Sequence, residues 1–335
     1  MRNTQHKEDP KMPNNRKYYT NGSVHFISTR TETGLPLIPT FLVNHIIWGI
    51  LASARDRYDV RICHFLFMAN HFHLLAVVGN PQHLSDFVGY VKGEIAHAVN
   101  RLLGRKKRTI WEEGYDSPRL LTAADVLRYI NYIYANPAKA NLEKDIDRYP
   151  GVSSWTMFLE DDFCRKHQRV ERFAIPKLAS PALSIGEQKR IVSRLQSLGG
   201  DTHEFQLEPW AWLNSFPETQ NAEIGELKSR IIGDLRAVEL EEELKRREHN
   251  KQVIGATALR RQSMLLEHTP KKHAPRMVCI SSDHDLRKAF LSLYRELCSI
   301  ARRTYEAWKR GELSKRMPPG LFAPHVPILC SEFGI

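Results

Sequence analysis

The chain has few cysteines and lacks any hydrophobic run long enough to cross a membrane. Its 335 residues include five cysteines, which are scattered and form no Cys-x-x-Cys pair. This pattern indicates neither a disulfide framework nor a zinc cluster. No stretch of eighteen apolar residues occurs, and residues 1–16 are polar, without the apolar segment of a signal peptide. We therefore expect a cytoplasmic protein without a membrane partner, and reduced thiols at Cys63, Cys164, Cys279, Cys298 and Cys330.

The chain is basic overall. It contains 49 Lys and Arg residues against 38 Asp and Glu residues, which gives a net charge of +11 and an isoelectric point near 9.4. Such a charge favours a polyanionic partner, although a basic protein without one would show it too. The excess is spread along the chain, so composition alone does not indicate which surface would bind nucleic acid.

The hydrophobic pattern of residues 18–158 alternates between strands and helices. An apolar content of 42% is ample for packed cores, and the length suggests two or three domains. After an arm at residues 1–17, which we expect to be disordered, this segment predicts an α+β domain. Its expected architecture is a ferredoxin-like antiparallel sheet with helices on one side. The expected strands are residues 23–29, 60–68, 73–78 and 117–121, and the expected helices are residues 39–57, 83–103 and 122–136.

The rest of the chain is predicted to be mainly α-helical. We expect a linker at residues 159–182, a helical region at 183–266, a second linker at 267–282, a long helix at 283–316 and a proline-rich tail at 317–335. Ser184 and Glu187 have the spacing of a capping box at a helix start. Residues 253–261 pair small turn residues with a basic helix, as in a helix-turn-helix. DNA contact, packing on the first domain and partner binding all stay open for this half.

Two histidines, His71 and His73, are separated by one residue at the predicted start of a strand. In a strand, alternate side chains share a face, so these two would project together while Phe72 points into the opposite layer. Such a pair can bind one divalent ion. The alternative interpretation is two half-buried strand histidines, because a lone His-x-His pattern is not specific.

A tyrosine-rich helix follows sixty residues later. Thr122 is expected to cap it, with Asp125 three residues on, and Pro137 is expected to end it. Tyr132 and Asn136 are four residues apart and share one helix face, which would present a phenol and an amide oxygen together. For Tyr129 and Tyr134 we favour simple packing against the apolar side of the helix.

Four segments together resemble the REP-associated tyrosine transposases, which belong to the single-tyrosine HUH transposases of IS200-like kind. The matching runs are Met-Ala-Asn-His-Phe-His-Leu-Leu (68–75), Trp-Glu-Glu-Gly-Tyr (111–115), Tyr-Ile-Tyr-Ala-Asn-Pro (132–137) and Tyr-Pro-Gly-Val-Ser-Ser-Trp (149–155). The order and spacing match across about residues 18–155. The family usually has Met-Pro before the histidine motif, whereas this chain has Met68-Ala69; the departure lies in the turn and leaves the histidines intact.

The resemblance implies a metal-dependent DNA transposase or endonuclease. Members of the family cut single-stranded DNA by tyrosine attack, which makes a 5′-phosphotyrosine and frees a 3′-hydroxyl. By motif, Tyr132 is the nucleophile, His71 and His73 are metal ligands, and Asn136 occupies the position of the third ligand. Two imidazoles and an amide oxygen carry no charge, so the ion, Mg²⁺ or Mn²⁺, would be held weakly until a phosphate joined it.

The expected partner is single-stranded or palindromic hairpin DNA, and we expect a monomer rather than a homodimer. A basic loop with a nearby aromatic residue suits phosphate contact and base stacking, although a solvated loop would look the same. A non-cutting DNA-binding regulator with the same fold, and a relaxase or replication initiator with the same chemistry, are the alternative functions. The candidate DNA contacts are Arg101, Arg105, Lys106, Lys107, Arg108, Trp111, Arg119 and Arg128.

Overall fold

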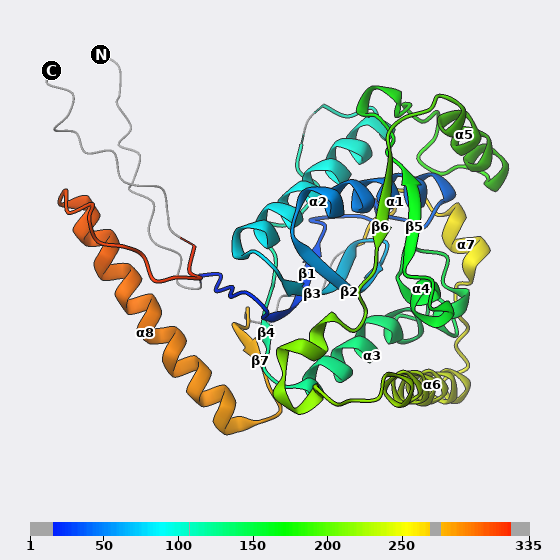
Figure 1. The fold of residues 1–335 in the computed structure, drawn as a ribbon. Coiled ribbons are helices and arrows are strands. Elements are labelled where there is room, and N and C mark those ends of the chain that lie inside the picture. Colours follow the sequence, from blue (N-terminus) through cyan, green and yellow to red (C-terminus); the bar gives the residue numbers. More distant parts are fainter. Residues whose placement is uncertain (1–15, 107, 269–275, 323–335) are drawn as a thin grey trace, which may run out of the picture.

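A five-stranded, mainly antiparallel sheet lies at the centre of the protein (Figure 1). The computed structural model describes residues 16–106, 108–268 and 276–322. The strand order β2-β3-β1-β4 is that of a ferredoxin-like fold, and a short β7 adds to β4 in parallel. The predicted α+β class is therefore confirmed. The strands are β1 (Val24–Arg30), β2 (Val60–Phe67), β3 (His71–Val78), β4 (Arg119–Leu120) and β7 (Cys279–Ile280).

Helices cover both faces of the sheet. Helices α1 (Phe41–Arg57) and α2 (Pro81–Leu102) share a core with the β3 side chains Phe72 and Leu74. Helix α3 (Ala123–Lys139) packs on the other face, against Leu75 and Val77. The expectation of helices on one side holds for α1 and α2 and is wrong for α3. The physical reason is that β3 is apolar at both odd and even positions, so each face needs its own cover.

Short polar side chains fix where these helices begin. The side chains of Thr40, Asn80 and Thr122 accept hydrogen bonds from the first-turn N–H groups of α1, α2 and α3. These N–H donors have no acceptor within the helix itself, so each cap satisfies a group that would otherwise lack a hydrogen bond within the protein. The predicted cap of the tyrosine helix at Thr122, with Asp125 in its first turn, is confirmed.

The segment after residue 158 is part of the same core. Strands β5 (Cys164–Gln168) and β6 (Thr202–Gln206) form a two-stranded antiparallel sheet over α1, where the ring of His167 stacks on Trp48 at 4.5 Å. Phe205 lies in the core shared by α1 and α2. The expected linker at 159–182 therefore contains an ordered strand. This strand, Cys-Arg-Lys-His-Gln, is half-buried or exposed throughout, so no alternation of apolar residues marks it in the sequence.

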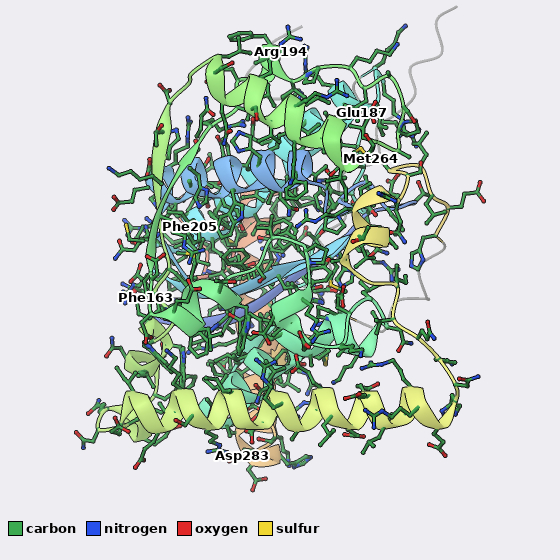
Figure 2. The ribbon with its side chains drawn as sticks, turned by 90° about the vertical axis from the view of Figure 1, so that its right-hand side faces the viewer. Phe163, Glu187, Arg194, Phe205, Met264 and Asp283 are labelled. Atoms are coloured by element: carbon green, nitrogen blue, oxygen red, sulfur yellow. The ribbon has the colours of Figure 1, made fainter. Side chains whose placement is uncertain are left out.

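The C-terminal half is otherwise mainly helical, as expected. The capping box of Ser184 and Glu187 is confirmed at the start of α5, and in Figure 2 Glu187 lies at the end of the molecule opposite Asp283. None of the described helices is long and apolar enough to span a membrane. The remaining helices are α4 (Trp155–Glu160), α5 (Ile185–Ser197), α6 (Ile224–Glu248), α7 (Ala256–Arg261) and α8 (His284–Lys309), with short 3-10 turns η1 (Ile146–Arg148), η2 (Arg172–Ala174), η3 (Ala211–Ser215) and η4 (Pro217–Thr219).

Helix α7 packs against the first domain. Arg260 lies over the Phe41 ring, 3.9 Å from its centroid, and donates to the Pro39 carbonyl at 3.0 Å. Leu259 is buried. Of the three interpretations left open for residues 253–261, the structure favours packing.

Two histidines are fully enclosed in the domain. His64 contacts the Tyr134 hydroxyl through Nδ1 at 2.8 Å, and His25 contacts the Ser117 carbonyl at 3.0 Å. Burial lowers the pKa of each imidazole to about 3. Both rings are therefore neutral in the folded protein at neutral pH, since a charged imidazole would lose its hydration there.

We expect this burial to make the protein sensitive to acid. An unfolded histidine has a pKa near 6.5, so below that pH the unfolded chain binds protons that folded His25 and His64 do not. Each ring should lower the free energy of unfolding by about 1.4 kcal/mol per pH unit, from about pH 6 down to the folded pKa. Urea unfolding at several pH values measures this slope. His64→Gln should flatten it by about 1.4 kcal/mol per unit; an unchanged slope would contradict the assignment.

Candidate active site

The histidine pair lies on one face of β3, as predicted. The ring centroids of His71 and His73 are 4.8 Å apart, and the His73 ring stacks on Phe26 of β1 at 5.2 Å. Phe72 points the other way and packs against Phe67 at 4.8 Å. The two-residue period of the strand thus places both imidazoles toward α3.

Both imidazoles have a nitrogen lone pair available for a ligand. His71 Nδ1 lies 2.7 Å from the Asn70 side-chain oxygen, which only accepts, so Nδ1 carries the proton and Nε2 the lone pair. The two ring nitrogens of His73 are buried and find no hydrogen-bond partner within the described residues. Burial lowers the pKa of His71 to about 4, helped by the positive charges of His268 and Arg30. Burial also lowers the pKa of His73 well below its usual value.

Of the three tyrosines of α3, Tyr132 is the one that faces the pair with its side chain accessible. Its ring centroid is 5.3 Å from that of His73, and the residue is 39% exposed. Tyr129 packs on Phe26 at 4.7 Å, and Tyr134 is buried with its hydroxyl 2.8 Å from Ser154 Oγ. Burial raises the pKa of Tyr132, so its phenol is protonated at neutral pH.

Asn136 is oriented by the proline that follows it. Helix α3 continues to Lys139, three residues past 136, so the expectation that Pro137 ends the helix is wrong. Proline has no N–H, which leaves the Ile133 carbonyl without its usual donor. The Asn136 amide nitrogen takes that place at 3.3 Å and also donates to the Tyr132 carbonyl at 2.7 Å. Because the nitrogen is committed to the helix, the side-chain oxygen is the atom that Asn136 offers to a ligand.

These residues line one cavity of about 920 Å³. Among its walls are Tyr132, Asn136 and the two histidines, and also residues that the sequence did not indicate. Lys139 lies 5.8 Å from the Tyr132 ring, seven residues along the same helix face, a spacing that would have revealed it. The C-terminal half adds further side chains, which no local pattern marks; among them are Leu259, Gln262, Leu266, Glu267, His268 and Arg276.

The donor set fits a weakly held divalent ion. Within the part of the chain that the structure describes, no three His, Cys, Asp or Glu side chains form a metal site. A site here would consist of two neutral imidazoles and the Asn136 oxygen, and the partnerless nitrogens of buried His73 are the feature that fits it. Imidazole suits Mn²⁺, and the amide oxygen suits Mg²⁺ as well.

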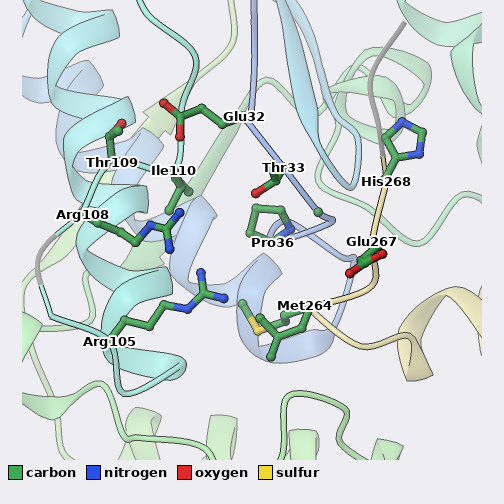
Figure 3. Close-up of a pocket in the computed structure, with 12 residues that line it drawn as sticks. Glu32, Thr33, Pro36, Arg105, Arg108, Thr109, Ile110, Met264, Glu267 and His268 are labelled. Carbon is green, nitrogen blue, oxygen red and sulfur yellow. The ribbon is translucent and has the colours of Figure 1, made fainter.

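Two of the predicted DNA contacts enter a second cavity. Arg105 and Arg108 both line a space of about 360 Å³, where their guanidinium groups lie on the same side (Figure 3). Glu267 and His268 line this cavity and the one at Tyr132, so the two spaces adjoin. Lys106 is exposed, and Lys107 lies outside the described residues. Phosphate contact at this loop remains a prediction, now centred on the two arginines.

Other predicted contacts have structural roles. Trp111 is 4% exposed, and its indole donates to the Lys92 carbonyl at 2.8 Å, so its ring is not available for base stacking. Arg101 donates to the Phe173 and Ile175 carbonyls at 3.1 and 3.2 Å. Both side chains hold loops together, which sequence spacing cannot reveal. Base stacking by Trp111 would require its ring to leave this position, whereas Arg101 is exposed and its contact with DNA stays a prediction.

Arg119 and Arg128 lie away from the Tyr132 cavity. Arg119 stacks on Phe290 at 5.7 Å and donates to Thr20 at 3.2 Å, and burial lowers the pKa of its guanidinium. Arg128 is exposed and pairs with Asp125 at 2.9 Å. Neither lines the cavity. DNA contact by Arg119 would require it to leave its packing, whereas Arg128 remains accessible.

A ferredoxin-like sheet thus brings a His-x-His strand and a tyrosine helix to one cavity. Residues 23–135, about a third of the chain, match the family model described as "Transposase IS200 like", so this part of the chain is similar to that family. No curated protein matches the chain. The matched span contains strands β1 to β4, the histidine pair and Tyr132, while the C-terminal half lies beyond it.

Eight chains of solved structures are similar to this one. One is a REP-associated tyrosine transposase bound to a REP hairpin, with 18% identity over 45% of this chain and 87% of that one, and a TM-score of 0.39. Another is a transposase from Deinococcus radiodurans R1, with 22% identity over 36% of this chain and 97% of that one, and a TM-score of 0.24. Neither score is high enough to support an argument about function.

The role of Pro137 can be tested by restoring the missing N–H. In Pro137→Ala, the new N–H should bond to the Ile133 carbonyl and displace the Asn136 amide from it, which leaves the Tyr132 carbonyl as the amide's single helix partner and loosens the side chain. We expect affinity for Mn²⁺, measured by calorimetry, to fall about 10-fold, as when other supporting partners of ligands are lost. The free energy of unfolding should not fall, because alanine favours a helix over proline. Asn136→Ala removes the side-chain oxygen altogether and therefore shows the largest loss of Mn²⁺ affinity to expect. Unchanged affinity in Pro137→Ala would refute the orienting role of the proline.

The two faces of β3 should respond differently to truncation. Phe72→Ala opens a cavity between the sheet and α1 and should lower the free energy of unfolding by about 3–5 kcal/mol. His73→Ala removes a buried ring whose nitrogens lack partners in the described chain, so it should lower the free energy of unfolding less than Phe72→Ala does. Urea unfolding of both variants checks the order. The interpretation of the faces fails if the histidine variant is the less stable one.

Proposed function

We propose that this protein cuts and rejoins hairpin-forming single-stranded DNA through a covalent bond between Tyr132 and a 5′ phosphate. The observation that carries the proposal is the selective orientation of Tyr132. Its ring lies 5.3 Å from that of His73 and lines the histidine cavity, whereas Tyr134 is buried in a hydrogen-bonded pair with Ser154. Hairpin-forming DNA as the substrate rests on the resemblance of the four sequence motifs.

The proposed step is a balanced phosphoryl transfer. The Tyr132 oxygen forms a bond to phosphorus, the bond from phosphorus to the 3′ oxygen breaks, and the phenol proton ends on the freed 3′-hydroxyl by way of solvent. Rejoining reverses each change. The covalent intermediate keeps the energy of the phosphodiester, so no further reactant is consumed.

The residues of the cavity each have a part in this proposal. His71, His73 and the Asn136 oxygen would hold the divalent ion, which neutralises charge on the phosphate when bound. Lys139 lies 5.8 Å from the Tyr132 ring and brings a positive charge toward the phenolate form of the nucleophile. Arg105 and Arg108 would hold phosphates of the strand in the adjoining cavity.

The C-terminal half is needed for this site. Helix α6 packs on α3, the helix that bears Tyr132, with Ile231 and Leu235 in the shared core. Gln262, Leu266 and Arg276 line the cavity itself. A chain cut near residue 158 would expose these apolar surfaces, so we expect the full chain to be the active form.

Tyr132→Phe should abolish the covalent adduct while DNA binding stays near that of the wild type, because only the hydroxyl is lost. The assay is incubation of the full chain with hairpin-bearing single-stranded DNA and Mn²⁺, followed by denaturing electrophoresis. Tyr129→Phe is the matched control on the same helix, since its ring packs on Phe26. Adduct formation by Tyr132→Phe, or its loss in Tyr129→Phe alone, would reject the nucleophile. Binding without any adduct in the wild type would indicate a non-cutting regulator.

A further inference from the structure

Helix α8 stands at one side of the molecule, apart from the central sheet and its covering helices (Figure 1). One side of the helix is buried, with Tyr294, Ala301 and Tyr305 among its residues. Asp283 caps it by accepting from the Leu286 N–H at 2.9 Å. Tyr294, Ala301 and neighbouring side chains pack with Leu321 and with Tyr18, which precedes β1. The Tyr294 hydroxyl also donates to the Arg16 carbonyl at 2.7 Å. The apolar stripe of the helix is thus packed against the segments that precede β1 and follow α8, and its other side is exposed.

The exposed side of α8 carries a row of cations, beside the exposed leucines Leu286 and Leu293. Lys288, Arg295 and Arg302 recur every seven residues, which places them on one stripe of the helix, and all three are exposed. Arg287 and Arg303 flank the row and are exposed too. None of the five forms an ion pair within the described residues. Six basic and three acidic residues give α8 a net charge of +3.

Helix α6 shows that this row is not a general property of exposed helices here. It has six basic and seven acidic residues, a net charge of −1. Its exposed cations are paired along the helix: Arg230 with Asp234, Lys245 with Glu241, and Arg247 with Glu243. Helix α6 therefore has the charge pattern of a solvated face, and α8 does not.

We propose that the cationic face of α8, defined by Lys288, Arg295 and Arg302, binds the backbone of the duplex stem of the hairpin substrate. The inference rests on the proposed function for the existence of that substrate. A helix of 26 residues is about 39 Å long, which matches roughly one turn of duplex DNA, and a seven-residue spacing puts the cations about 10 Å apart. Duplex DNA carries one charge per about 1.7 Å, so each cation meets a phosphate.

A duplex fits this face better than a single strand does. Single strands are bound mainly by basic grooves with aromatic rings on which bases stack. The four aromatic side chains of α8, Phe290, Tyr294, Tyr305 and Trp308, are all on its packed side and buried or half-buried. The cationic face offers charge without stacking, which suits backbone contact that does not depend on base sequence.

The position of α8 also fits the stem. Arg276 lines the Tyr132 cavity, and a few residues later β7 pairs with β4 at the edge of the sheet. Helix α8 begins at His284, directly after that strand. The sheet thus fixes one end of α8 relative to the site of cutting, so that a strand in the cavity and its duplex stem on α8 can be bound at once.

The test compares two triple variants of the full chain that lose equal charge. Lys288→Ala, Arg295→Ala and Arg302→Ala remove the row on α8, and Arg230→Ala, Lys245→Ala and Arg247→Ala remove paired cations on α6. Fluorescence anisotropy gives Kd at several salt concentrations for two probes. One is a hairpin with a stem of about 20 base pairs, long enough to cover the helix at 3.4 Å per pair, and the other is an unpaired oligonucleotide.

The α8 variant should flatten the salt dependence of hairpin binding by up to about 2.7 in the slope of log Kd against log salt, at 0.9 per phosphate. Between about 50 and 200 mM salt, the wild type should therefore lose up to roughly 40-fold more affinity for the hairpin than the α8 variant does. Binding of the unpaired probe, and its covalent adduct, should stay unchanged, as should both slopes in the α6 variant. Circular dichroism checks that the variants are folded. We expect them to be, because alanine has a high helix propensity at exposed positions.

Three results would overturn the assignment of α8. They are an unchanged hairpin slope, an equal loss in the α6 variant, and a change of oligomeric state in sedimentation that shows the row to bind a second copy. A wild-type chain that forms no adduct on either probe, yet shows the α8 effect on hairpin binding, would reject the proposed chemistry and leave the stem surface standing.

Discussion

The alternation of β3 between two buried faces is the constraint on which the rest of the structure depends. The strand packs Phe72 and Leu74 toward α1 and α2, and His71, His73 and Leu75 toward α3. A shift of one residue in its pairing would exchange these faces and place the imidazoles in an apolar layer. The register of β3 against β1 completes the core. The same register therefore also places the histidine pair opposite the tyrosine helix.

The site couples backbone chemistry to side-chain orientation at the end of α3. A proline within a helix normally costs stability because one carbonyl loses its donor. Here the Asn136 amide replaces that donor at Ile133, so the defect directs the side-chain oxygen outward. Burial acts on the histidines in a similar way: by lowering their pKa values it keeps both imidazoles neutral, the form that binds metal.

Packing, and not the local density of cations in the sequence, determines which positive charges of this protein are available to a partner. The densest run of cations, residues 101–108, contains Arg101, which holds a loop, and Arg105 and Arg108, which share a cavity. The more dispersed cations of α8 form a row that makes no ion pair with any residue the structure describes. The fold brings carbonyls and carboxylates to some cations and leaves others exposed. For Arg101, the carbonyl of Phe173 comes from more than seventy residues away in the sequence.

The sequence by itself determined the α+β class, the capped starts of α3 and α5, the shared face of His71 and His73, and the separation of Tyr132 from Tyr134. These follow from local rules, since strand and helix periods and cap geometry act within a few residues. Only the tertiary structure decided that α3 covers the second face, that Trp111 is buried, and that Leu266 and Arg276 close the cavity. Those outcomes depend on contacts between distant segments, where burial of apolar surface selects among arrangements that the local pattern leaves equivalent.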